Sequence, residues 1–246
     1  MTVYDIIKDF CEKNKIPATE SQLFSFETLT DDLLEFNSHT NLTALKDRES
    51  IAVKHYADSI APLIFDVIPQ KATVIDVGCG AGFPGLPLKI MREDIAITFL
   101  DSTEKKLKFT KSIAEKFGFQ ADFYAKRAED VAFGPLREQF DVAVSRAVAT
   151  LPVLLELCLP FVKAGGIFIA YKSTKESDPD AKDSELSKSE NALRQLCAKV
   201  IDIKELTLPF LPDGTEQKHN LLLIKKTGKL STNYPRRYAQ ILKKPL

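Results

Sequence analysis

The chain has 246 residues, a length that suits one large domain or a domain with a small appendage. Apolar residues make up 44% and charged residues 28%, so the chain can bury a core without help from disulfides or metals. The 34 basic and 34 acidic residues give a net charge of zero, a total that argues against a nucleic-acid partner held by bulk positive charge.

The N-terminal part of the chain carries three apolar stripes at helical spacing. They lie over 3–11, 26–36 and 53–67; Pro62 should bend the third, and a polar turn is expected over 37–41. Acidic residues in the first stripe exclude a signal peptide. No uncharged apolar run approaches the ~20 residues that span a membrane.

From residue 71 onward, short β-branched or aromatic runs alternate with helical stretches, which predicts an α/β fold with a mostly parallel sheet. No helix separates the last two strands, so a hairpin there would place one antiparallel strand in the sheet. Strands are predicted over 73–77, 95–101, 121–126, 140–146, 166–172, 199–208 and 219–226. Helices are predicted over about 85–91, up to 117, near 150–162 and over roughly 184–198, with a polar loop over 173–185.

A glycine-rich loop joins the first strand to its helix over residues 74–85. Its three glycines, Gly78, Gly80 and Gly82, allow positive φ and let a ligand approach the backbone at the switch point of the sheet. The segment fits two cofactors, because 80–85 matches the dinucleotide pattern GxGxxG, whereas 78–82 matches the GxGxG loop of S-adenosylmethionine enzymes.

Two neighbours of the glycines favour S-adenosylmethionine. Asp76 can meet the ammonium of a methionine moiety, directly or through water, whereas its charge would repel a pyrophosphate. Pro84 removes a backbone N–H from the start of the helix, which disfavours phosphate binding. Asp101, at the end of the second strand, is expected to accept hydrogen bonds from ribose hydroxyls in either cofactor class.

Two further strand ends offer candidate side chains. After the third strand, Glu129 or Asp130 could accept from the adenine amino group, or could be ordinary acids at a helix N-terminus. Arg146 ends the fourth strand and should face the crevice, unless it forms a structural salt bridge. The four cysteines lie far apart and only three histidines exist, so we expect no metal site and a reducing cytoplasm as the compartment.

Four blocks, residues 41–44, 54–59, 76–85 and 145–147, resemble the signature segments of a known family. This is the glucose-inhibited division protein B family of 16S rRNA (guanine-N7) methyltransferases. The resemblance implies a class I methyltransferase fold with a Rossmann-like seven-stranded sheet, its last strand antiparallel, behind an N-terminal helical extension. It implies S-adenosylmethionine as cofactor. The implied substrate is one guanosine in the 530 loop of 16S rRNA, either in the free rRNA or in the small ribosomal subunit. The implied cofactor contacts are Gly78, Phe83, Asp101, Ser102, Thr103, Ala128, Glu129 and Arg146.

The reaction class agrees with what the chain lacks. The fourth strand ends in Ser145-Arg146-Ala147, without the Asn/Asp-Pro-Pro-aromatic motif of amine methylation, and no Pro-Cys pair provides a nucleophile for pyrimidine carbon. Guanine N7 carries a free lone pair, so its methylation needs no general base. We expect Arg146 at the reacting centre, holding the methionine carboxylate or guanine O6. His55 and Asp58 line the pocket mouth or form a helix-surface pair.

The zero net charge conceals an uneven distribution. Residues 1–216 carry 26 bases against 34 acids, and the rest of the chain carries eight bases and no acid. We expect a helical extension over 1–70, a methyltransferase domain over 71–228 and a basic tail over 229–246 that binds RNA. We also expect a monomer that makes no contact with a membrane. The expected RNA contacts are Lys172, Arg236, Arg237, Lys243 and Lys244.

Three alternatives remain open at this point. A methyltransferase of the same fold could act on another RNA, a protein or a small molecule. A nicotinamide-dependent oxidoreductase would use the GxGxxG pattern. A non-catalytic RNA-binding module could retain the cofactor fold without turnover.

Overall fold

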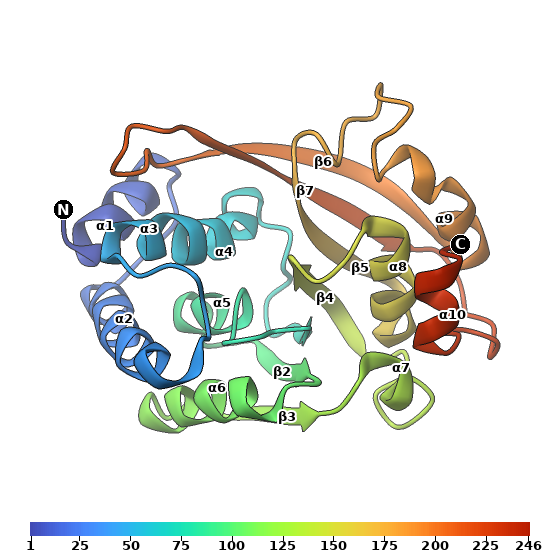
Figure 1. The fold of residues 1–246 in the computed structure, drawn as a ribbon, viewed down its shortest axis with the longest axis horizontal. Coiled ribbons are helices and arrows are strands. Elements are labelled where there is room, and N and C mark those ends of the chain that lie inside the picture. The colour runs from blue at the N-terminus through green and yellow to red at the C-terminus, as the bar shows by residue number, and fades with distance from the viewer.

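A single seven-stranded sheet forms the centre of the computed structural model, which describes residues 1–246 (Figure 1). The strand order is β3-β2-β1-β4-β5-β7-β6. Neighbouring strands pair in parallel except at β7, which runs antiparallel to both β5 and β6. The predicted α/β sheet with its antiparallel last strand is therefore confirmed. The strands are β1 Thr73–Val77, β2 Ala96–Asp101, β3 Ala121–Ala125, β4 Phe140–Arg146, β5 Val162–Ser173, β6 Ala198–Leu208 and β7 Gln217–Lys226.

Helices cover both faces of the sheet because side chains alternate along each strand. Val74 packs with the N-terminal helices, α5 and α6, whereas its neighbour Ile75 packs with α8 on the opposite face. Figure 1 shows α1 to α6 on one side of the sheet and α8 to α10 on the other. The α-helices are α1 Val3–Lys13, α2 Glu20–Thr40, α3 Arg48–Ile51, α4 Asp58–Ile60, α5 Gly85–Met91, α6 Glu104–Lys116, α7 Ala128–Val131, α8 Leu151–Cys158, α9 Glu190–Gln195 and α10 Tyr238–Lys243.

The chain reverses its direction across the sheet between β1 and β4. After β1 it moves outward to β2 and β3, and then returns to place β4 on the other side of β1. The register sets Asp76 opposite Val144, so the loops that follow β1 and β4 leave the sheet side by side. Ligands of open α/β sheets bind at such a switch point, at the carboxyl ends of the strands.

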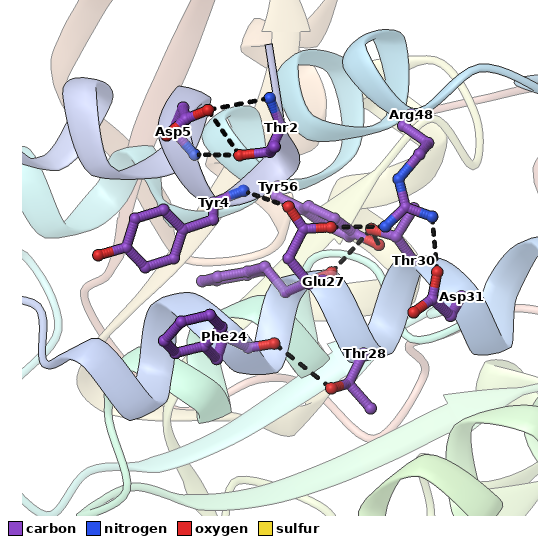
Figure 2. A network of polar contacts seen from close by, with 11 residues as sticks. Thr2, Tyr4, Asp5, Phe24, Glu27, Thr28, Thr30, Asp31, Arg48 and Tyr56 are labelled. Atoms are coloured by element: carbon purple, nitrogen blue, oxygen red, sulfur yellow. Dashed lines mark hydrogen bonds and ion pairs between the residues drawn. The ribbon is translucent and has the colours of Figure 1, made fainter.

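The N-terminal helices are tied together by the polar contacts in Figure 2. The Arg48 guanidinium spans two acids of α2, with Nη2 2.5 Å from Glu27 Oε2 and Nη1 2.6 Å from Asp31 Oδ1. Deeper in the same layer, the hydroxyls of Thr30 and Tyr56 lie 2.9 Å apart, and both residues are fully buried. These contacts fix the segment after α3 against α2, and that segment continues into the site.

Two predicted elements differ from the structure. A polar turn is predicted over 37–41, but residues 37–40 are helical because α2 continues to Thr40. Asn41 caps the helix, with a φ of 51°. The Asn37 side chain instead braces the following loop, accepting from the Thr43 N–H and donating to the Thr43 carbonyl, each at 3.0 Å. The helix predicted over 184–198 is confined to α9 and a preceding 3₁₀ turn.

The bend predicted at Pro62 falls where the helical segment changes its type. The helical segment that starts at Arg48 passes through a π-helical stretch, Ala52–Ala57, and then tightens into the 3₁₀ helix Ala61–Phe65 that contains Pro62. No helix of this protein has the length and apolar character needed to span a bilayer.

Candidate active site

A cavity of about 910 Å³ opens at the carboxyl ends of β1 to β5. The glycine loop, the N-terminal helical segment, the start of β7 and the C-terminal helix all contribute to its walls. Most of the side chains that the sequence singled out meet here. Those that line the cavity are His55, Asp58, Gly78, Gly80, Phe83, Asp101, Ser102, Thr103, Ala128, Glu129, Arg146 and Lys172.

The glycine loop is shaped by backbone that favours glycine. Gly78, Gly80 and Gly82 all have positive φ, at 74°, 55° and 88°. A Cβ on Gly78 would lie 2.4 Å from a methyl group of Val148, so the loops after β1 and β4 touch there. Gly82 lies behind the cavity wall, against Leu86 of α5. The backbone conformation therefore favours glycine at all three positions, and Gly78 also allows the close approach of Val148.

Asp101 ties this loop to the end of β2. Its Oδ2 accepts from the Gly80 N–H at 2.8 Å and its Oδ1 accepts from the Thr103 N–H at 2.7 Å. Each carboxylate oxygen has a second lone pair, and the side chain lines the cavity. Asp101 can thus organise two loops and still accept hydrogen bonds from a hydroxyl-bearing ligand.

Asp76 lies behind the cavity rather than in its wall. The side chain is fully buried, and Oδ2 accepts from the Gly85 N–H at the start of α5 at 2.7 Å. Burial raises the pKa of this carboxyl to about 7. Oδ1 is buried without a hydrogen-bond partner. In the structure, Asp76 holds the start of α5. Its Oδ1 is free to accept a hydrogen bond from an ammonium group, and this expected contact stays a prediction.

Arg146 is the centre of a polar network that joins four parts of the chain. Its Nη1 donates to Asp58 Oδ2 at 2.8 Å and to the Lys54 carbonyl at 2.9 Å, while its Nη2 lies 3.2 Å from His55 Nδ1. The guanidinium also lies over the Phe83 ring, 5.7 Å from its centroid. Its Nε makes no hydrogen bond within the protein, so the side chain has a donor left for a ligand.

Asp58 is the buried anion that holds this arginine. Its side chain is 2% exposed, and its second oxygen, Oδ1, lies 2.8 Å from His219 Nδ1. Burial opposes ionisation of Asp58, but the hydrogen bond from His219 and the charge of Arg146 outweigh it and lower the pKa of Asp58. The hydrogen bond with Asp58 raises the pKa of His219. The cluster is thus a negative carboxylate between two donors.

His55 is held on both sides and is neutral at physiological pH. Its ring stacks on Phe83 with centroids 4.5 Å apart, and Nε2 lies 2.8 Å from Thr43 Oγ1. Burial and the neighbouring Arg146 lower the pKa of His55 to about 3. Both ring nitrogens are engaged, so the geometry favours a positioning role for His55 over proton transfer.

Two side chains expected to contact RNA are instead paired inside the protein. The Lys172 Nζ lies 2.7 Å from Glu185 Oε2 and donates to the Ala149 carbonyl, and the residue is buried. Arg236 forms a fork on Glu156, with contacts from 2.6 to 3.2 Å. Each charge is therefore matched by a carboxylate of the protein, and the expected contact of either side chain with an RNA phosphate stays a prediction. Arg237, Lys243 and Lys244 are exposed, outside the cavity.

Sequence reasoning missed His219, and it placed Tyr238 in the RNA-binding tail rather than at this site. His219 lies at the start of β7, 161 residues from Asp58, and Tyr238 begins α10. One signal was available for His219, since it lies two residues before the apolar run of β7, the strand that pairs with β5. No group of three or more His, Cys, Asp or Glu side chains could hold a metal ion.

The strand order and the cavity at the switch point define the fold as that of the class I methyltransferases. A structure titled as a SAM-dependent methyltransferase from Methanosarcina mazei has a similar fold, with a TM-score of 0.51 and 14% identity over 68% of this chain and 98% of that one. The family model described as GidB, rRNA small subunit methyltransferase G, matches residues 22–207. The chain belongs to this family.

Full-length relatives agree with this assignment. A protein named ribosomal RNA small subunit methyltransferase G from Alkaliphilus metalliredigens is 41% identical over 98% of both chains. Its namesake from Clostridium beijerinckii is 40% identical over 100% of both chains. The resemblance seen in the sequence blocks is therefore confirmed over the whole length of the chain.

Proposed function

We propose that the protein transfers a methyl group from S-adenosylmethionine to N7 of one guanosine in the 530 loop of 16S rRNA. The observation that carries the proposal is the gathering of the glycine loop, Asp101, Glu129 and Arg146 around one cavity at the switch point. The names of the full-length relatives support small-subunit rRNA as the substrate class. We expect the protein to act in the cytoplasm, where ribosomal subunits assemble.

The residues present fit S-adenosylmethionine. The cavity volume of about 910 Å³ lies within the range of small-molecule sites. We infer that Asp101 accepts from the ribose hydroxyls and that Ala128 and Glu129 meet the adenine. The methionine end would lie near Gly78 and Arg146, and the unpartnered Asp76 Oδ1 supports an ammonium or a bridging water behind the loop. When bound, the cofactor supplies a sulfonium that makes its methyl group electrophilic.

The protein's contribution is to hold the reacting groups in line and to exclude water. Such positioning can supply ~7–11 kcal/mol of the barrier. Guanine N7 has a free lone pair, so no proton must be removed before attack and the site needs no general base. His55 is neutral, hydrogen-bonded at both nitrogens and stacked on Phe83, so it fixes one wall of the pocket.

The N7 atom also constrains the form of the RNA. In an A-form duplex it lies in a deep, narrow groove that side chains cannot read, so the target must lie in a loop or be flipped outward. We infer that the base enters beside Arg146 and Phe83, where the guanidinium Nε is available to guanine O6 or to the methionine carboxylate.

The decisive test is methyl transfer to ribosomal subunits from a strain that lacks the enzyme. We expect labelled methyl to appear as one 7-methylguanosine in 16S rRNA, identified by nucleoside mass spectrometry. Cofactor binding without transfer would favour the non-catalytic RNA-binding alternative. Calorimetric binding of NAD in place of S-adenosylhomocysteine would favour the oxidoreductase.

The exposed bases of the tail remain proposed RNA contacts. Replacing Arg237, Lys243 and Lys244 together with alanine is expected to weaken rRNA binding and to lower its salt dependence, because up to three phosphate contacts would be lost. Affinity for S-adenosylhomocysteine should not change. Filter binding at several salt concentrations measures the effect, and an unchanged salt slope would refute RNA contact by this tail.

A further inference from the structure

We propose that the C-terminal segment, residues 228–246, completes the adenosine end of the cofactor cavity, with the Tyr238 ring as the group that contacts the adenine. This inference rests on the proposed function, since adenosine is part of the proposed cofactor. It assigns to the tail a role in cofactor binding that is separate from any contact with RNA.

Tyr238 is the residue through which the tail reaches the cavity. It is half-buried and lines the cavity on the side where Arg127, Ala128 and Glu129 leave β3. The Arg127 guanidinium lies over its ring, 4.8 Å from the centroid. One face of the phenol ring is therefore covered by a cation, and the side chain borders the region proposed for adenine.

A buried ion pair fixes the chain two residues before Tyr238. Glu156 is in α8 and is fully buried. Arg236 meets it with its backbone N–H at 2.8 Å, with Nε at 2.9 Å and with Nη2 at 2.6 Å. A bidentate arginine–carboxylate pair sets direction as well as distance, so it determines where α10 begins.

A second set of contacts holds the segment upstream. The Arg137 guanidinium donates to the carbonyls of Ser231 at 3.0 Å and Tyr234 at 2.9 Å, and Glu138 accepts from the Leu230 N–H at 3.0 Å. Downstream, Ile241 of α10 is fully buried against the face that carries α8. Figure 1 shows α10 lying beside α8 and near α7. Tyr238 is thus held from both sides along the chain.

These restraints indicate a built wall rather than a loose arm. A flexible tail that binds RNA would not need the ion pair with the buried Glu156. It would not need Arg137 either, which donates to the carbonyls of Leu230, Ser231 and Tyr234. An aromatic ring suits the edge of an adenine site because it offers a large apolar surface with few rotatable bonds. The tail therefore belongs to the cofactor site, and only its exposed bases are free for RNA.

The test is isothermal calorimetry on the full-length chain with S-adenosylhomocysteine and 5′-methylthioadenosine, which lacks the amino-acid end. Tyr238→Ala is expected to lower the affinity for both ligands by the same factor, about tenfold, because one base–aromatic contact would be lost. Tyr238→Phe keeps the ring and should bind within about twofold of wild type. Leu242→Ala, an exposed change on the same helix, should have no effect.

If the wild-type protein binds S-adenosylhomocysteine and Tyr238→Ala binds it with the same affinity, the inference is overturned and the proposed function stays intact. If Tyr238→Ala lowers the affinity for S-adenosylhomocysteine but not for methylthioadenosine, the inference is also overturned, since the contact would then lie at the amino-acid end. Wild-type binding of neither ligand would refute the proposed function itself. Should Tyr238→Ala lose α10 by circular dichroism, Tyr238→Leu retains the packing and provides the same comparison.

Discussion

Replacing Arg146 with alanine is expected to lower the rate of methyl transfer by at least about 100-fold, the usual loss when one preorganised donor is removed from a reacting centre. Arg146 joins the end of β4 to the N-terminal helical segment through Asp58, Lys54 and His55. Its Nε is the donor of this network that faces no protein acceptor. The substitution removes the charge, the free donor and the surface over Phe83 together.

The two proposed roles of Arg146 give different kinetics. If the guanidinium holds the methionine carboxylate, the dissociation constant for S-adenosylhomocysteine should rise along with the loss of rate. If it holds guanine O6, cofactor affinity should change little, and the loss should appear in kcat at saturating cofactor. Single-turnover transfer to undermethylated 30S subunits, together with calorimetry, separates the two.

Stability must be followed in the same variants, because Asp58 is buried and would retain only His219 as a partner. Arg146→Lys keeps the positive charge without the planar fork, and we expect a smaller loss of stability with most of the loss of rate. Wild-type turnover in Arg146→Ala would contradict a role at the reacting centre and leave the arginine as a structural salt bridge.

The sequence predicted those parts of the site that depend on local chain geometry. A strand that ends in glycines, an acid at the end of the next strand and an arginine at the end of the fourth meet because parallel strands share one edge. The placement of Gly78, Asp101 and Arg146 around one cavity followed from their positions alone. Asp76 shows the limit, since the same periodicity cannot say whether a strand residue points into the cavity or behind it.

Contacts between distant segments could not be predicted in the same way. Arg236 lies on a polar stretch and Lys172 ends the apolar run of β5. Their partners are the fully buried Glu156 and the half-buried Glu185, which are 80 and 13 positions away. One sign was present, because Glu156 interrupts an otherwise apolar helix, and an acid in such a place needs a partner. The partner's identity depends on how the tail packs, which hydrophobic spacing does not encode.

Replacing Arg236 with alanine is expected to destabilise the fold by about 3–5 kcal/mol, the cost of leaving one member of a buried ion pair alone. Glu156 is fully buried, and it accepts hydrogen bonds only from Arg236, from the backbone N–H, Nε and Nη2. The backbone N–H of residue 236 would remain to share the charge, but the guanidinium fork would be gone. Urea denaturation at pH 7, followed by circular dichroism, measures the loss.

The neighbouring Arg237→Ala is the matched control, since that side chain is exposed and its loss should change stability by less than about 0.5 kcal/mol. The double change Glu156→Leu with Arg236→Leu should recover much of the stability, because a buried pair can often be replaced by packed apolar groups. Equal destabilisation by the two single arginine changes would contradict the pairing. Recovery of stability by the double variant without recovery of cofactor affinity would show that the fork also aims Tyr238, which links the stability of the tail to the binding of the cofactor.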